Sequence, residues 1–245
     1  MPSQCKVHLP WLIVAAALPL GDLSVTAPYT TGVCAAGTRE HFRLQEKWDA
    51  SPDSKLLRFS LPHKISSMPS HTGDGAYLAP TGVYCISNVT AGDGELKKSY
   101  SPVSLPDAAG HLDLLVKAYQ PRPGGGLGAH RCALQPGDDV LMEIKPPRAI
   151  HGDPVIASRW KRLGFVAGGT GVAPMVQMIR FLLSKPEDKT ELWLLSINRY
   201  EHDILMRSQL EELAAKHPGR LHLTFSCTKP PEGWQVPIPV HIERC

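Results

Sequence analysis

The sequence predicts an α+β protein of two domains, an antiparallel β-barrel followed by a doubly wound α/β domain. Three observations predict this fold class. Residues 41–147 contain short strands separated by Gly, Pro, Asp and Asn turns, as in barrels and sandwiches. Beyond residue 162, apolar strands alternate with helical patterns, which is typical of a parallel sheet. A glycine-rich turn joins the first of these strands to a helix.

The composition is typical of a packed globular protein, and the charge and motifs argue against several classes of function. The chain has 245 residues, of which 42% are hydrophobic and 20% charged. A net charge of +3 is too small for a dedicated nucleic-acid binder and favours anionic ligands or acidic protein partners. No C-x-x-C pair, H-E-x-x-H motif or local Ser, His and Asp grouping occurs, so we expect neither a metal site nor a hydrolase.

The first 37 residues are predicted to lie outside both domains. The apolar segment Trp11–Leu20 is preceded by Lys6 and His8, and it is shorter than the roughly 20 residues that a membrane-spanning helix needs. A signal-peptide core, an organelle-targeting segment, a shallow membrane anchor and an unstructured leader all remain open.

Residues 38–147 are predicted to form the barrel domain. Each strand is bounded by turn residues, and its apolar side chains suit a sheet with a buried face. The predicted strands are Phe42–Glu46, Leu56–Leu61, Val83–Val89, Leu112–Tyr119 and Asp139–Ile144.

A linker at residues 148–162 precedes the α/β domain at residues 163–245. The linker carries Pro, Gly and mixed charge, and the pattern after it changes to strand, helix, strand, helix, strand. This order is the mononucleotide-binding half of a doubly wound sheet. The predicted parallel strands are Leu163–Ala167, Leu192–Ile197 and Leu221–Ser226.

Local signals mark the two helices between these strands. Pro174 is predicted to occupy the first helical position, where its missing amide costs nothing, and Pro186 ends that helix. Ser208 and Glu211 have the spacing of a capping box, so we expect the second helix to be capped by Ser208.

The turn from Gly168 to Gly171 is the first candidate for ligand binding. Glycines at positions 168, 169 and 171 allow close backbone approach, and the following helix start favours a phosphate or pyrophosphate. Thr170 adds a hydroxyl. A tight connection without a ligand is the alternative.

The barrel half carries two further candidates. The segment Lys98–Ser104 combines a cation, an aromatic ring and hydroxyls, a set that suits a phosphate and a flat ring, although a basic strand end would look alike. The segment Gly124–Gly128 is either a phosphate-approach loop or a flexible turn.

The three candidate segments and three other blocks occur in an order that resembles a known family. The similarity runs from about Glu40 to Trp234 and indicates the NADH-cytochrome b5 reductase branch of the ferredoxin-NADP reductase superfamily. The blocks are KSYSPVS, GHLDLLVKAY, GGGLG, LQPGDDV, GFVAGGTGVAPMVQMIRFLL and LLSINRYEHDILMRSQLEEL.

The resemblance implies a flavin-binding barrel and a pyridine-nucleotide domain. It implies FAD and NADH as cofactors, hydride transfer from NADH to the flavin, and electron transfer to a haem acceptor such as cytochrome b5. It also implies a membrane-associated protein, mitochondrial or at the endoplasmic reticulum and facing the cytosol, with peripheral attachment through the N-terminal segment. No nucleic-acid partner is expected.

Site residues follow from the resemblance position by position. Ser101 and Thr170 are the expected catalytic pair, because their hydroxyls match positions near the flavin ring. Tyr100 is expected to pack against the flavin, and Lys98 to face the FAD pyrophosphate. The other expected cofactor contacts are Ser99, Leu115, Lys117, Gln120, Gly126, Leu127, Gly128, Gly168, Gly169 and Gly171, with Lys117 also a candidate for NADH contact.

Several positions depart from the family pattern. Lys98 replaces an arginine and loses its planar fork, and Gly126 and Gly128 replace a lysine and a serine, so we expect weakened FAD binding. Arg199 follows the second strand of the α/β domain and is able to accept a 2′-phosphate, so NADPH stays open beside NADH.

The segment Gln235–Cys245 matches nothing in the family, where more sheet follows. We therefore expect Leu163–Ala167 to lack one neighbouring strand, and the exposed edge to favour aggregation. Three alternatives stay open: a non-catalytic truncated relative that binds flavin or a partner, an incomplete gene model of the reductase, and an enzyme with another acceptor, as in nitrate reductases.

Overall fold

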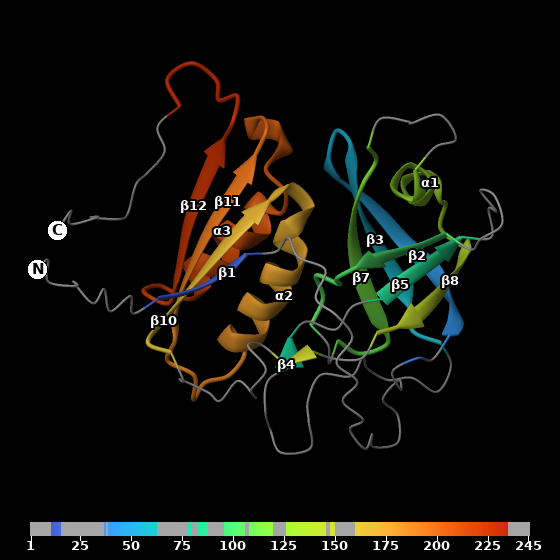
Figure 1. Ribbon diagram of the computed structural model, residues 1–245, viewed down its shortest axis with the longest axis horizontal. Coiled ribbons are helices and arrows are strands. Elements are labelled where there is room, and N and C mark those ends of the chain that lie inside the picture. Colours follow the sequence, from blue (N-terminus) through green and yellow to red (C-terminus); the bar gives the residue numbers. More distant parts are fainter. Residues whose placement is uncertain are drawn as a thin grey trace, which may run out of the picture.

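The chain forms two lobes that lie side by side, each built on its own sheet (Figure 1). The N-terminal lobe is an antiparallel barrel, and the C-terminal lobe is a parallel sheet with helices, which confirms the predicted fold class. The computed structural model describes residues 11–15, 37, 39–62, 78–79, 83–87, 96–105, 108–119, 126–145, 148–149 and 160–234.

The sheet of the N-terminal lobe curls so that its first and last strands meet. Its strand order is β6-β5-β8-β2-β3-β7, with every neighbouring pair antiparallel. Just after β6, Pro102 forms a bridge with Leu114 of β7, which closes the curl. The strands are β2 (Arg39–Ser51), β3 (Ser54–Ser60), β5 (Val83–Ser87), β6 (Leu96–Tyr100), β7 (His111–Lys117) and β8 (Asp139–Ile144).

Side chains that alternate along these strands fill the inside of the curl. Phe42, Phe59, Leu112 and Met142 are fully buried there, as period-two patterning requires. The lobe also contains a two-stranded pair, β4 (Leu78–Ala79) with β9 (Arg148–Ala149), and one short helix, α1 (Leu127–Ala133), which the sequence analysis did not predict.

The C-terminal lobe contains the three predicted parallel strands, each extended by one or two residues. Alternate side chains of the sheet, including Phe165 and Leu194, pack against two helices in one apolar cluster. These elements are β10 (Arg162–Gly168), α2 (Val172–Leu183), β11 (Glu191–Asn198), α3 (Arg207–Lys216) and β12 (Leu221–Cys227).

A fourth strand lies where none was expected. The strand β1 (Trp11–Ala15) pairs in parallel with β10, from Trp11 opposite Arg162 to Ala15 opposite Val166, so the sheet order is β1-β10-β11-β12. The expectation that Leu163–Ala167 lacks one neighbour is therefore wrong, and part of the segment assigned outside both domains joins a sheet. Local pattern does not reveal this pairing because it joins residues about 150 apart in sequence.

Both helix starts differ from the sequence predictions. Helix α2 begins at Val172, two residues before Pro174, because the preceding turn Gly169–Gly171 is a 3₁₀ turn that leads directly into it. Helix α3 begins at Arg207 after Met206, whose φ is 58°, and no side chain caps it. The predicted capping box is wrong, since Ser208 lies inside the helix.

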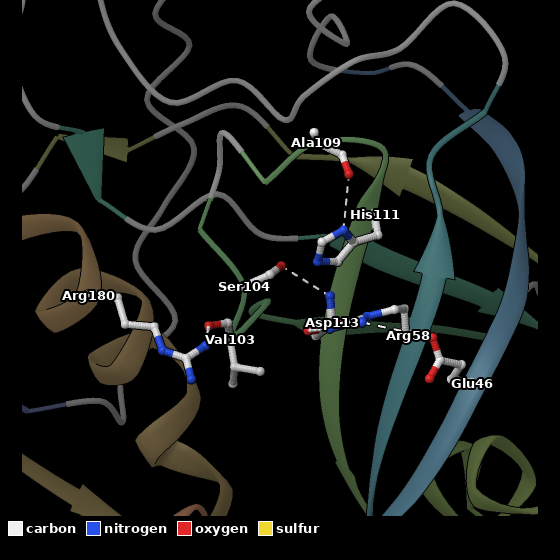
Figure 2. A network of polar contacts seen from close by, with 8 residues as sticks. All are labelled: Glu46, Arg58, Val103, Ser104, Ala109, His111, Asp113 and Arg180. Carbon is white, nitrogen blue, oxygen red and sulfur yellow. Dashed lines mark hydrogen bonds and ion pairs between the residues drawn. The ribbon is translucent and has the colours of Figure 1, made fainter. Parts of the chain in front are cut away.

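Hydrogen bonds from α2 hold the two lobes together, and Figure 2 shows the one from Arg180. Arg180 Nη1 donates to the carbonyl of Val103 over 2.7 Å, and Gln177 Nε2 donates to the carbonyl of Ser104 over 3.1 Å. Asp113 stabilises the acceptor segment, because its amide donates to Ser104 Oγ and its carboxylate accepts two bonds from Arg58. The lobe interface thus contains hydrogen bonds as well as apolar contacts.

Burial lowers the pKa of the Arg180 guanidinium, and the Asp113 carboxylate works in the opposite direction. The lobe interface is therefore a partly desolvated environment, in which a bond from an ionised donor is stronger than at the surface.

Within the described residues, no helix combines the length and apolarity that crossing a bilayer requires.

Candidate functional site

A cavity of about 330 Å³ lies at the junction of the two lobes. The ends of β6 and β7 form one wall, and the turn after β10 with the start of α2 forms the other. Its lining residues are Lys98, Ser99, Tyr100, Ser101, Leu115, Lys117, Tyr119, Gly168, Thr170, Gly171, Ala173 and Pro174. Most of the predicted site residues thus share one hollow although they come from separate parts of the chain.

Strand β6 brings a cation and an aromatic ring to the barrel wall. Lys98 and Tyr100 are two residues apart, so they lie on the same face of the strand. Lys98 Nζ lies 5.5 Å from the ring centroid of Tyr100 and 5.3 Å from that of Tyr119. Within the described ranges no carboxylate pairs with Lys98, which leaves its charge available to an anion such as a pyrophosphate.

Ser99 and Ser101 contribute hydroxyls from either side of Tyr100. Ser99 Oγ accepts a hydrogen bond of 2.9 Å from Lys145 Nζ, so this hydroxyl already has a protein donor. Ser101 is half-buried at the point where β6 ends. Of the two, Ser101 is the hydroxyl that no described side chain holds in place.

Lys117, at the end of β7, is held by Asp53. Lys117 Nζ lies 2.7 Å from Asp53 Oδ2, and the hydroxyls of Ser51 and Ser54 also donate to Asp53 Oδ1. Burial alone would raise the pKa of Asp53, but the hydrogen bonds from these three partners outweigh it and lower that pKa. The charge of Lys117 is therefore shared with a carboxylate, unlike that of Lys98.

The wall from the C-terminal lobe is mostly backbone. Strand β10 ends at Gly168, beside which a Cβ would meet nothing within 4 Å, so a ligand has room to approach the main chain there. Gly169 has a φ of +50°, which a glycine adopts without strain. Thr170 and Gly171 line the cavity. Gly169 is not among the lining residues, and its positive φ shapes the turn that contains Thr170 and Gly171.

The structure does not place every predicted residue in this cavity. Gly126 precedes α1, and Leu127 and Gly128 lie within it. A Cβ at Gly128 would collide with the carbonyl oxygen of Lys117, so this glycine permits α1 to pack on β7. That Cβ would also lie 3.8 Å from Lys98 Nζ, so Gly128 is next to this amine. Gln120 falls outside the described residues.

Sequence reasoning missed three residues of the lining. Tyr119 is 56% exposed and follows β7 directly, and Ala173 and Pro174 belong to the first turn of α2. Tyr119 could have been predicted as a lining residue, because it closely follows the strand that carries Lys117. Ala173 and Pro174 have no chemical signature, and only the packing of α2 brings them to the cavity.

The residues present suit a flavin. The cation of Lys98 fits a phosphate, the faces of Tyr100 and Tyr119 fit an aromatic ring system, and the hydroxyls of Ser101 and Thr170 fit ring heteroatoms.

Two family models match the chain, one in each lobe. "Oxidoreductase FAD-binding domain" matches residues 41–149, and "Oxidoreductase NAD-binding domain" matches residues 165–241. The cavity described above lies between the two matched regions.

The chain is similar to proteins named NADH-cytochrome b5 reductase 1. It is 39% identical over 197 residues to NADH-cytochrome b5 reductase 1 of Lodderomyces elongisporus, covering 80% of this chain and 60% of that protein. It is 34% identical over 216 residues to the Bos taurus protein of the same name, covering 78% and 66%. The chain therefore spans about three fifths to two thirds of the length of these relatives.

A solved structure extends the similarity to three dimensions. The crystal structure of the cytochrome b5 reductase domain of Ulva prolifera nitrate reductase matches with a TM-score of 0.68 and 30% identity, covering 83% of this chain and 80% of that one. With its FAD-binding and NAD-binding domains and the cavity between them, this chain belongs to the NADH-cytochrome b5 reductase family of the ferredoxin-NADP reductase superfamily.

Proposed function

We propose that the chain is an FAD-dependent oxidoreductase that uses NADH to reduce a haem protein such as cytochrome b5. The single observation that carries this proposal is the cavity of about 330 Å³ whose lining joins Tyr100 and Ser101 of the FAD-binding domain to Thr170 of the NAD-binding domain. When bound, FAD accepts a hydride from NADH and releases the two electrons one at a time.

The residues of the chain bind and orient the reactants. Lys98 neutralises the FAD pyrophosphate, and Tyr100 packs against the flavin. The hydroxyls of Ser101 and Thr170 hydrogen-bond to polar atoms of the ring system. The roles of these four residues rest on their chemistry and on their shared cavity.

The NAD-binding domain positions the nicotinamide against the flavin. Gly168 and Gly171 let the dinucleotide approach the backbone, and the uncapped start of α2 offers amides to a phosphate group. Proximity of the two rings is the main contribution that the protein makes to hydride transfer.

Cytochrome b5 as the acceptor rests on the names of the similar proteins. The net charge of +3 suits an acidic haem partner, because opposite charges accelerate encounter.

Location at a mitochondrial or endoplasmic-reticulum membrane, facing the cytosol, is part of the proposal. Its support is the apolar segment Trp11–Leu20, which suits a shallow anchor. Because Trp11–Ala15 also pairs with β10, insertion of these five residues into lipid requires that this pairing opens. Flotation of the purified chain with anionic vesicles tests the attachment, and a chain lacking residues 1–20 is the control.

Reconstitution with FAD tests the enzymatic proposal. The purified chain, refolded with FAD and freed of excess cofactor, is expected to retain the visible absorbance of a flavin. NADH added without oxygen is expected to bleach it, and oxidised cytochrome b5 to restore it. A chain that retains no flavin would overturn the proposal. Flavin that NADH does not bleach would limit the chain to flavin binding.

A further inference from the structure

A second cavity, of about 460 Å³, lies between the hairpin of β2 and β3 and the start of α3. One wall is the outer face of the barrel, and the other consists of Ile204 and the first residues of α3. The cavity shares one lining residue, Leu115, with the cavity assigned to the flavin. It is therefore a separate hollow whose walls come from both lobes.

Strand register places an apolar row on the outer face of the barrel. Trp48 of β2 pairs with Leu56 of β3, which pairs with Leu115 of β7, so the three side chains lie next to one another on one face. The outer face of an antiparallel sheet is usually polar unless another element covers it. Here Ile204 and Met206, each 5% exposed, line the opposite wall of the cavity. The apolar row thus faces the C-terminal lobe across the cavity.

Trp48 is the member of this row that the lobe interface leaves open. Leu115 belongs to the apolar cluster of the C-terminal lobe and Leu56 packs against that cluster, whereas Trp48 is in neither cluster and is 38% exposed. The guanidinium of Arg58 lies 5.2 Å from the ring centroid of Trp48 and holds the ring in place. Figure 2 shows that Arg58 is itself fixed by Asp113. The indole ring therefore keeps free aromatic surface in a defined position beside the cavity.

Three charged side chains line the cavity, and each already has a partner of opposite charge. The pairs are Arg58 with Asp113 and Glu46, Arg207 with Glu201 and Glu211, and Asp49 with Lys55. A charged ligand would have to compete with these partners, because burial of a charge without its own counter-charge is costly. The lining therefore favours a neutral ligand.

We propose that this cavity binds a neutral, flat aromatic molecule that stacks on Trp48 and contacts both lobes. One face of the ring system lies against the indole, and the other meets the flexible apolar side chains of Ile204 and Met206. Ser208 and Gln209 offer a hydroxyl and an amide to a polar substituent.

A molecule bound in this cavity stabilises the docked arrangement of the two lobes, because only that arrangement brings the two walls together. The inference does not rest on the proposed function. Apart from Leu115, no residue of this cavity has an assigned role towards FAD or NADH.

Titration calorimetry on the full chain with 1-naphthol and two relatives tests this inference. Naphthalene-1-sulfonate keeps the fused rings but carries a charge, and decahydro-1-naphthol keeps the skeleton and hydroxyl but is not flat. 1-Naphthol is expected to bind about tenfold more tightly than the sulfonate, because it brings no charge into the cavity. It is expected to bind about three- to tenfold more tightly than the saturated alcohol, the range of one aromatic contact.

The same titration in saturating FAD separates the two cavities. Because FAD occupies the other cavity under the proposed function, the affinity for 1-naphthol is expected to stay within about twofold, well below the effect of direct competition. A chain that binds no FAD would contradict the proposed function, and the variants below would still decide the present inference.

Variants on both walls locate the ligand. Trp48→Ala is expected to weaken binding of 1-naphthol about tenfold, whereas Trp48→Phe keeps a ring and is expected to stay within about threefold. Ser208→Phe narrows the cavity from the side of α3 and is expected to weaken binding at least about tenfold, as overpacking of a filled site does. Ala215→Phe adds the same ring at an exposed position of α3 outside the cavity and is expected to leave the affinity unchanged.

Three results would overturn the inference. The first is no binding of 1-naphthol to the unmodified chain. The second is an affinity that neither Trp48→Ala nor Ser208→Phe changes, which would place the molecule elsewhere. The third is loss of binding in saturating FAD, which would place the molecule in the flavin cavity. If Ser208→Phe does not fold, the contrast between Trp48→Ala and Trp48→Phe decides.

Discussion

Arg180 of helix α2 donates a hydrogen bond of 2.7 Å to the backbone carbonyl of Val103 (Figure 2). Val103 lies shortly after β6, which ends at Tyr100 next to Ser101. One bond therefore ties the NAD-binding domain to the segment that forms the flavin wall of the cavity. The neighbouring bond from Gln177 to Ser104 acts on the same segment. This connection acts together with the apolar contacts between the lobes, in which Val103 also takes part.

Arg180→Met is expected to weaken the domain interface without abolishing FAD binding. Loss of the donor leaves the Val103 carbonyl without its partner, at a cost of about 1–3 kcal/mol in the free energy of unfolding. The rate of flavin reduction by NADH is expected to fall more than the affinity for FAD. Denaturant unfolding and stopped-flow absorbance measure the two effects.

Arg43→Met is the control for Arg180→Met. Arg43 forms an exposed pair with Asp139 within the FAD-binding domain, and such pairs contribute little. Equal loss of the reduction rate in both variants would show that the Arg180 bond does not set the domain geometry.

Lys98 is expected to govern the affinity for FAD. Lys98→Met removes the unpaired cation of the cavity, and the affinity is expected to drop by about 10- to 100-fold, the range of one charge-assisted contact. Lys98→Arg restores a planar fork for phosphate and is expected to bind FAD at least as tightly as the unmodified chain. Quenching of flavin fluorescence gives the three dissociation constants, and equal values would contradict the assigned role.

Ser101 is expected to influence hydride transfer more than cofactor binding. Ser101→Ala removes a hydroxyl that lines the cavity, and the rate of flavin reduction is expected to fall about tenfold with FAD retained, as for loss of one hydrogen bond. Ser101→Thr keeps the hydroxyl and is expected to recover most of the rate. If alanine and threonine behave alike, the hydroxyl has no part in the reaction.

Asp53 makes stability depend on pH in the acid range. Its pKa in the folded chain is lowered, because hydrogen bonds from Lys117, Ser51 and Ser54 outweigh the effect of burial. The folded state thus binds fewer protons than the unfolded state near the unfolded pKa of about 4. The stabilisation by Asp53 is therefore present above that pH and lost as the pH falls through the folded pKa.

The comparison with Asp53→Asn tests this pH dependence. At pH 7 the variant is expected to be less stable than the unmodified chain, and the difference is expected to shrink as the pH is lowered below about 4. Unfolding in urea at several pH values measures the difference. A difference that is constant with pH would mean that the carboxylate charge is not responsible.

The pairing of β1 with β10 predicts a role for the N-terminal strand in keeping the chain monodisperse. A variant lacking residues 1–15 exposes the edge of β10, and exposed strand edges favour association between chains. Light scattering is expected to detect larger species for this variant than for one lacking residues 1–9 only. Equal scattering of the two would argue that β1 does not protect the edge.

The sequence predicts the site residues where the relevant side chains stand close together along the chain. Lys98, Tyr100 and Ser101 stand within four residues, and the glycines around Thr170 mark a turn between strand and helix, so each half was recognisable alone. Gly126, Leu127 and Gly128 have a pattern that suits a phosphate loop, and in the structure they form the start of α1, which packs against β7. Their contact with FAD stays a prediction.

The sequence by itself determined the two-domain architecture, the three parallel strands from Leu163 onwards and the residue types that suit a flavin and a dinucleotide. Periodicity and turn residues encode these properties over short distances. Only the tertiary structure decided that Ser101 faces the same cavity as Thr170, that Asp53 holds Lys117, and that Trp11–Ala15 joins the edge of β10. These contacts join distant residues, and they depend on how the two lobes pack, which no local pattern specifies.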